Sequence, residues 1–250
     1  MTIMGWRVPM MASLLVWFAL WELIGRLDLV FLIPPFTSVV AAGAEMLPTA
    51  SFRSAVWITL HAFLVGMSFS LTIGIVIGVL MGRIRAVGDV LGMWVNIFES
   101  SPLTAVIPVL MAVLGFGQTT VIVTVFLFSV WVIALDTQVG VRQINPSLVE
   151  MARSFGASRV QLYTRILVLA ALPEILAGVR LGLIRGVKGV VIGQLLIAII
   201  GVGELFELYS RSFLMAHFWA LIILVFAFAF AISELIGLIE RKVEYYAGSR

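Results

Sequence analysis

The residues that could do chemistry in this chain are few, and most of them interrupt apolar stretches. Six of them are candidates to line a path across a membrane: Ser100, Ser101, Thr104, Arg185, Lys188 and Gln194. Ionisable side chains inside a membrane are costly, and they mark a transport route or pair with one another. The sequence therefore predicts a path that favours an anion near Arg185 or Lys188. Another interpretation stays open, in which either cation pairs with Glu99 or Asp136.

The periodicity of a helix limits how many of these residues can share one path. At about 100° per residue, Arg185 and Lys188 lie on one face, while Arg180 and Gln194 lie on a roughly opposite one. The run Ser100-Ser101-Pro102 breaks the preceding apolar stretch. Irregular backbone inside a membrane is tolerated only where it is buried in protein or lines a cavity. Both a pathway role and a structural kink are compatible with this break.

The sequence lacks the patterns of an enzyme's active site. It has no cysteine, which excludes disulfides, thiolate metal sites and cysteine nucleophiles. It has no G-x-x-x-x-G-K-[ST] motif, so it cannot cradle ATP in that way. His61 and His217 are far apart in sequence and lack the spacing of metal ligands. We therefore expect no catalytic residue, no metal site and no cofactor bound by this chain.

The composition is that of an integral membrane protein. Of the 250 residues, 62% are hydrophobic and 12% are charged, whereas soluble domains carry about 25% charged residues. Helical spans and short loops use up the whole length, so we expect an all-α fold with one transmembrane domain over residues 1–250. The net charge of +3 does not indicate nucleic-acid binding, because positive residues gather at cytoplasmic membrane edges.

Six transmembrane helices are predicted, at about residues 8–24, 55–81, 87–114, 119–141, 173–200 and 216–239. The first is a retained span, because it is too long for a signal peptide and contains Glu22. With the N-terminus inside, the inner segments hold Arg7, Arg83, Arg85, Arg142, Arg153, Arg159, Arg165, Arg241, Lys242 and Arg250, and the outer ones hold Arg26, Arg53 and Arg211. This bias predicts that both termini and the loop 143–172 are cytoplasmic, in a bacterial-type inner or plasma membrane.

Two smaller patterns predict how the spans are connected and packed. Pro34-Pro35 ends the segment after the first span, and Thr37 or Ser38 could cap a short helix that runs through Met46. In the second span a repeated G-x-x-x-G stripe would allow another helix to approach closely, although glycine is also common in membrane helices generally. The glycines of this stripe are Gly74, Gly78 and Gly82.

The loop 143–172 predicts a helix, a glycine turn and a second helix. Asn145 suits a helix N-cap and is followed by a proline at the first helical position. Gly156 has the place of a C-cap glycine with positive φ. Ser158 and Gln161 form a capping box that opens the second helix. Such a loop could lie on lipid, pack on its own bundle or present a ridge to a partner. The first helix has one predicted apolar face: Leu148, Met151, Ala152 and Phe155.

These residues resemble the EAA loop of ABC importer permeases. Glu150-Met151-Ala152 is followed after three residues by Gly156 and after nine more by Ile166. The segment MARSFGASRVQLYTRILVLAALPEILAGVRLGL is similar to the subgroup for nitrate, sulfonate, taurine and related substrates, and the resemblance covers most of the chain. It implies the six-helix transmembrane domain of a type I (MetI-like) ABC importer.

The resemblance also implies partners and roles. The loop would be a coupling helix that sits in a groove of a cytoplasmic ATPase dimer, which binds ATP and Mg²⁺. The other implied partners are an extracytoplasmic substrate-binding protein, a second copy of this permease and the membrane lipid. The implied substrate is a small, anionic nutrient. The residues that would contact the ATPase are Glu150, Met151, Ala152, Arg153, Phe155, Gly156, Ala157 and Ser158.

The chain departs from the family pattern at three places. Met151 replaces the middle alanine. Val168-Leu169 stands where the family has Leu-Pro, so that only Pro173 remains, and we expect a straighter exit helix. Gln194 stands where the subgroup often has an acidic residue, which weakens the assignment of a substrate more than that of coupling.

The alternative function is a secondary transporter or channel without an ATPase. It would need coupling carboxylates in the spans, and the candidates are sparse: Glu22, Glu99, Asp136 and Glu234.

Overall fold

The computed structural model describes residues 2–3, 6–7 and 10–248. Its elements are β1 (Thr2–Ile3), β2 (Trp6–Arg7), α1 (Met10–Arg26), α2 (Phe36–Met46), α3 (Ala50–Arg83), α4 (Arg85–Ser100), the 3₁₀-helix η1 (Leu103–Val106), α5 (Ile107–Leu114), α6 (Gln118–Arg142), α7 (Pro146–Ser154), α8 (Arg159–Gln161), the π-helix η2 (Leu162–Leu167), α9 (Val168–Ala170), α10 (Leu172–Ile197), α11 (Gly201–Arg211) and α12 (Met215–Gly248). Apart from one antiparallel pair of two-residue strands, the described residues form helices and their connections. The predicted all-α class is therefore confirmed.

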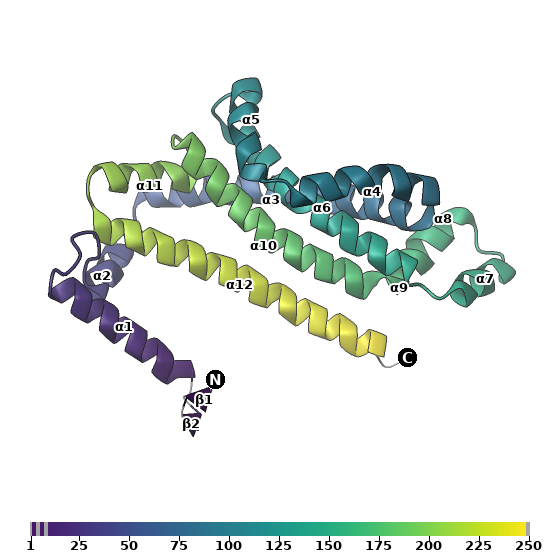
Figure 1. Ribbon diagram of the computed structural model, residues 1–250, viewed down its shortest axis with the longest axis horizontal. Helices are drawn as coiled ribbons and strands as arrows, with labels where there is room; N and C mark the ends of the chain where they lie inside the picture. The colour runs from purple at the N-terminus through teal and green to yellow at the C-terminus, as the bar shows by residue number, and fades with distance from the viewer. Residues whose placement is uncertain (1, 4–5, 8–9, 249–250) are drawn as a thin grey trace.

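Helix α6 lies between α3 and α10, and the three helices run side by side along the molecule (Figure 1). Glycines face α6 from both neighbours. A Cβ atom on Gly78 of α3 would lie 2.5 Å from Cβ of Thr137, and one on Gly182 of α10 would lie 2.6 Å from Cγ1 of Ile133. The predicted glycine stripe of α3 is therefore confirmed as a site of close helix packing, and the helix that packs against it is α6. Further glycines against which a Cβ would crowd α6 are Gly66, Gly74 and Gly82 on α3, and Gly178, Gly186 and Gly189 on α10.

Fewer of the described helices are long and apolar enough to cross a membrane than the six that the sequence predicts. Among the described residues, three helices (α3, α6 and α12) are long and apolar enough to cross a membrane, or up to five if two bent helix pairs each count as one span. Helix α1 has 17 residues, which reach about 25 Å, less than the roughly 30 Å of a bilayer's hydrocarbon core. Six spans and cytoplasmic termini stay predictions.

The predicted span 87–114 is two helices that meet at a bend of 92°. Ser101 is extended, with ψ of 147°, because the residue before a proline is disfavoured in the helical region. The predicted break at Ser100-Ser101-Pro102 is therefore confirmed. In Figure 1, α5 projects away from the bundle that α3, α6 and α10 form. Gly115, with φ of 84°, ends this helix.

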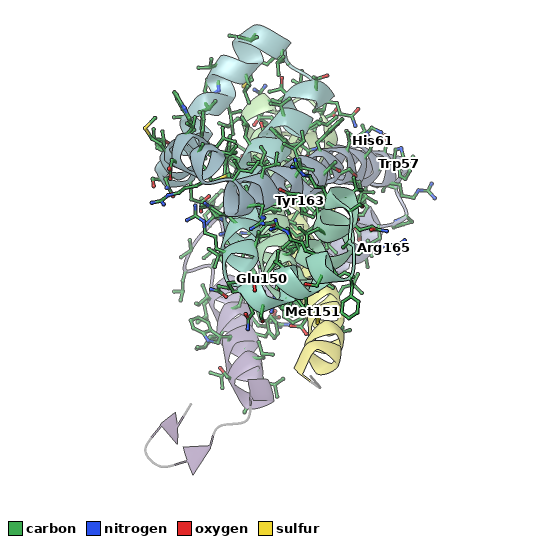
Figure 2. All side chains as sticks on the ribbon, turned by 90° about the vertical axis from the view of Figure 1, so that its right-hand side faces the viewer. Trp57, His61, Glu150, Met151, Tyr163 and Arg165 are labelled. Atoms are coloured by element: carbon green, nitrogen blue, oxygen red, sulfur yellow. The ribbon has the colours of Figure 1, made fainter. Side chains whose placement is uncertain are left out.

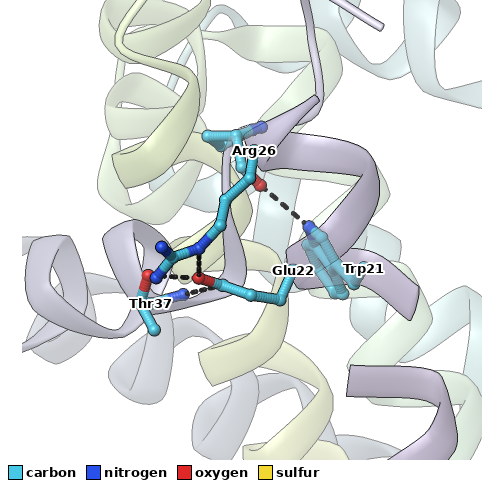
Figure 3. Close-up of polar contacts among 5 residues, drawn as sticks. Trp21, Glu22, Arg26 and Thr37 are labelled. Atoms are coloured by element: carbon cyan, nitrogen blue, oxygen red, sulfur yellow. Dashed lines mark hydrogen bonds and ion pairs between the residues drawn. The ribbon is translucent and has the colours of Figure 1, made fainter. Parts of the chain in front are cut away.

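At the end of the molecule opposite to α7, helices α1 and α2 meet, and polar contacts join them (Figure 3). The predicted helix through Met46 is confirmed as α2, but its predicted cap is wrong. The carboxylate of Glu22 on α1 accepts hydrogen bonds from the backbone N and Oγ1 of Thr37, each at 2.9 Å, and from Nε of Arg26 at 2.6 Å. A side chain from another helix thus satisfies the free N–H group. Trp21 Nε1 donates to the carbonyl of Pro34 at 3.0 Å.

The contact between α3 and α6 can be tested with two glycine substitutions. In Gly78→Ala the added Cβ would clash with α6, and overpacking of this kind typically costs about 1–3 kcal/mol. The matched control is Gly92→Ala on α4, where the nearest atom to an added Cβ is Cε of Met81 at 3.9 Å. We expect a lower thermal unfolding midpoint for the detergent-solubilised Gly78→Ala protein and an unchanged or higher one for the control. Equal midpoints for the two variants would contradict the close contact.

Candidate functional site

The loop 143–172 folds as capped helices at one end of the molecule (Figure 1). Helix α7 begins as predicted. The Oδ1 atom of Asn145 accepts a hydrogen bond from the backbone N of Ser147 at 3.0 Å and from its Oγ at 2.8 Å. Pro146 occupies the first turn, where a missing N–H leaves no helical hydrogen bond unmade. The start of α7 is therefore fixed by its own sequence.

The turn after α7 is built on Gly156. Its φ is 76°, which confirms the predicted left-handed conformation. The backbone N of Ala157 donates to the carbonyl of Ala152 at 3.0 Å, and that of Gly156 donates to the carbonyl of Arg153 at 2.9 Å. This pair of bonds is the Schellman motif, which satisfies carbonyl groups at the end of a helix. No neighbouring atom lies within 4 Å of a Cβ placed on Gly156, so the backbone conformation alone demands glycine.

The second helix of the loop begins at the predicted capping box. The backbone N of Gln161 donates to Oγ of Ser158 at 3.2 Å, and the backbone N of Ser158 donates to Oε1 of Gln161 at 2.9 Å. The helix contains the π-turn η2 and meets α10 at a bend of 69°. The predicted straighter exit helix is therefore wrong. The bend falls at Ala171, directly before Leu172-Pro173, so this later proline is enough to permit the break.

The predicted single apolar face of α7 is divided in the structure. Ala152 is buried and Leu148 is half-buried, whereas Met151 and Phe155 are exposed by 52% and 85%. The inward face belongs to a small cluster of buried residues: Val149, Ala152, Leu162 and Leu167. These four residues span only about 100° of the helix, and the buried side is rotated away from their centre toward Val149 and Ala152. An outward apolar ridge results, and Figure 2, which views the molecule from this end, labels Glu150 and Met151 on it.

The two predicted cations of α10 lie in different surroundings. Arg185 forms an ion pair with Glu99 of α4, with side chains that are 39% and 21% exposed. Beside this pair, the ring of Phe98 stacks on Trp131 of α6 at 4.6 Å. Lys188, about one turn further on, is exposed and forms no hydrogen bond or ion pair with any other described residue. For Arg185, the structure therefore confirms the alternative interpretation of the sequence, in which this cation pairs with Glu99.

The hydroxyl residues at the break between α4 and η1 lie at the surface of the chain. Ser100 and Thr104 are exposed. Ser101 is half-buried, and its Oγ donates to the carbonyl of Ile97 at 2.6 Å. This hydrogen bond is local to α4 and leaves the outward hydroxyls of Ser100 and Thr104 available. The break thus offers polar groups on the outside of a single chain.

Gln194 is buried inside the single chain. Its side chain is 1% exposed, and its Oε1 accepts hydrogen bonds from Oγ1 of Thr59 at 2.9 Å and from the backbone N of Val202 at 3.2 Å. These contacts join α3, the end of α10 and the start of α11. Gln194 therefore makes a structural contact within one chain, and its predicted place in the pathway stays a prediction. The sequence did not predict the contact of Thr59 with Gln194, because Thr59 is marked only as a hydroxyl residue within an apolar span.

Comparison with known proteins gives a consistent set of similarities. Residues 70–245 match the family described as "Binding-protein-dependent transport system inner membrane component". A probable ABC transporter permease protein of Brucella melitensis is 30% identical over 171 residues, which are 68% of this chain and 70% of that one. The taurine transport system permease protein TauC of Escherichia coli is 26% identical, with 79% of this chain and 77% of that one covered. The nitrate import permease protein NrtB of a Synechocystis strain is 28% identical, with 63% and 58% covered.

A solved structure has the same fold. The protein is similar to a chain in the structure of the MetNI methionine ABC transporter in an inward-facing conformation, with a TM-score of 0.66 and 25% sequence identity. The match covers 77% of this chain and 96% of that one. Most of the described helices therefore follow an arrangement that occurs in a transporter structure.

The ion pair between α4 and α10 can be tested by a double-mutant cycle. Glu99→Gln would leave Arg185 without its acidic partner, and breaking one side of a buried pair costs roughly 3–5 kcal/mol. Because this pair is partly exposed, we expect a smaller loss of stability. The double variant Glu99→Gln/Arg185→Gln should recover part of it, measured as the thermal midpoint in detergent. If the loss in the double variant equals the sum of the two single losses, the side chains do not interact.

Proposed function

Because the chain belongs to the family of binding-protein-dependent transport system inner membrane components, we propose that a separate ATPase drives it by docking on residues 145–158. As in its relatives, the chain is the permease subunit of an ABC transporter in the inner membrane and is not itself an enzyme. One observation carries the docking proposal. The loop is a rigid, doubly capped pair of helices that turns Met151 and Phe155 outward.

The exposed ridge has the properties of a docking surface. A phenylalanine that is 85% exposed leaves apolar area in contact with water, and burying such an anchor in a partner's pocket is favourable. Val160, just beyond the Gly156 turn, is also 70% exposed and extends the apolar surface. Glu150, Arg153, Ala157 and Ser158 would surround these anchors with polar and small groups. We propose that the ATPase groove receives the ridge.

We further propose that the pathway forms between two copies of this chain, with an extracytoplasmic binding protein delivering the substrate. Lys188, Ser100 and Thr104 present polar groups on the surface of one chain. Exposure of a lysine ammonium to lipid inside a membrane is costly, so a second copy or an aqueous path is the more favourable neighbour. Arg185 supports such a path by holding α10 to the broken span through Glu99.

The substrate that we propose is a small nutrient with an anionic group. The unpaired ammonium of Lys188 favours it, because a positive group on a path attracts negative ligands. The relatives transport different molecules, since taurine, nitrate and methionine appear in their names. The anionic class therefore depends on Lys188 and on the taurine and nitrate relatives, and the separate binding protein would select among small anions.

Reconstitution tests the proposed energy source. Vesicles that contain this permease, with its ATPase inside and the binding protein outside, should take up labelled taurine or nitrate only when ATP is enclosed. Uptake should fall to background when the ATPase is left out. Full uptake by the permease alone would contradict the proposal and would favour a secondary transporter or channel.

Coupling through the loop can be tested at Gly156. A β-branched residue in the left-handed region costs about 1–2 kcal/mol, so Gly156→Val should distort the turn that aims the ridge. We expect the variant to insert normally but to retain less ATPase on co-purification and to transport less. Gly156→Asn is the matched control, because asparagine tolerates positive φ. Normal ATPase retention and transport in Gly156→Val would count against coupling through this loop.

A further inference from the structure

A polar cavity of about 380 Å³ lies beside the coupling loop, between the ends of α3 and α6 and the helix α7. Four charged residues line it: Arg83, Arg142, Glu150 and Arg153. Three positive charges against one negative charge give the lining a net charge of +2. The cavity therefore suits an anionic ligand.

The arginines of this cavity are not neutralised within the chain. None of the three forms a hydrogen bond or ion pair with another described residue. Arg142 is exposed, and its Nη2 atom approaches Gly88 of α4, 2.7 Å from the position that a Cβ would take there. A guanidinium that packs against a helix and lacks a partner is prepared to bind a phosphate oxygen by charge-assisted hydrogen bonds.

The position of the cavity indicates the source of the anion. Arg83 and Arg142 are the last residues of α3 and α6, two helices long and apolar enough to cross the membrane. Their guanidinium groups therefore lie at the level of the lipid headgroups, on the side that the charge bias assigns to the cytoplasm. Basic pockets between transmembrane helices on this side bind anionic headgroups. The aliphatic side chains of Val141, Val149 and Leu167 complete the lining.

We propose that this cavity binds the phosphodiester headgroup of an anionic phospholipid through Arg83 and Arg142. Arg153 of α7 also lines the cavity and adds a third positive charge. The carboxylate of Glu150 can accept a hydrogen bond from a headgroup hydroxyl, which favours a polyol headgroup such as that of phosphatidylglycerol. The bound lipid then joins the membrane bundle to the root of the coupling helix.

Native mass spectrometry of the purified full chain tests this site by titration with phosphatidylglycerol or phosphatidylcholine. Arg83→Gln and Arg142→Gln should each weaken phosphatidylglycerol binding about five-fold, which corresponds to about 1 kcal/mol for one arginine near the membrane surface. The matched control is Arg85→Gln, because Arg85 is exposed two residues from Arg83 and does not line the cavity. Because Arg85 lies outside the cavity, this variant should bind phosphatidylglycerol within about two-fold of the parent protein, since a solvent-screened charge outside the site contributes little.

Two results would overturn the proposal. An equal loss of binding in Arg85→Gln would show only a general attraction of the basic surface for anionic lipid. Displacement of phosphatidylglycerol by millimolar inorganic phosphate would show a site for free anions instead. If Arg83→Gln fails to fold, Arg83→Lys keeps the charge, and it should retain binding if the site is electrostatic. A complete loss of binding in well-folded Arg83→Lys would contradict the site. The measurement needs neither transport nor the ATPase, so it is independent of the proposed function.

Discussion

The close packing of α6 between the glycine faces of α3 and α10 is the constraint on which the rest of the structure depends. In lipid there is no hydrophobic force between helices, so association relies on the short-range contacts that small residues permit. Thr137 and Ile133 of α6 occupy the space that side chains at Gly78 and Gly182 would fill. Hydroxyl groups add cross-helix bonds, such as Ser129 Oγ to the carbonyl of Gly182 at 2.8 Å. The three helices therefore form one rigid unit.

This rigid unit holds both ends of the loop 143–172. The loop leaves α6 at Arg142 and returns at Ala171, which is fully buried. A Cβ on Gly140 of α6 would lie 2.7 Å from Cβ of Glu174 and 3.3 Å from Cβ of Ala171. A force on α7 is therefore applied directly where α6 and α10 meet. Because only residues 143–145 separate α6 from α7, the proposed motor protein would act close to the core of the bundle.

Local features of the loop could be predicted from sequence, whereas tertiary ones could not. Asn145, Gly156 and Ser158 act through hydrogen bonds to residues within five positions, so their types and spacing were sufficient. Gln194 looked like a pathway residue because a single helix does not reveal its partners on α3 and α11. The apolar residues of α7 showed that the helix had apolar faces, but not which of them would meet the bundle. The run Ser100-Ser101-Pro102 predicted a break in the helix, but it could not predict the 92° angle of the bend.

The polar residues within the helices fall into two groups, and the difference bears on how the chain is assembled. Gln194, Ser129 and Arg185 bond to other residues of the same chain, so these contacts stabilise one copy. Lys188 is exposed about 24 Å along α10 from its first residue, in the interior of this 26-residue helix. A charge on a helix inside a membrane is stable only beside water or protein. Lipid alone is therefore an unfavourable neighbour for this face of α10, which supports an assembly in which one chain supplies only part of the transport pathway.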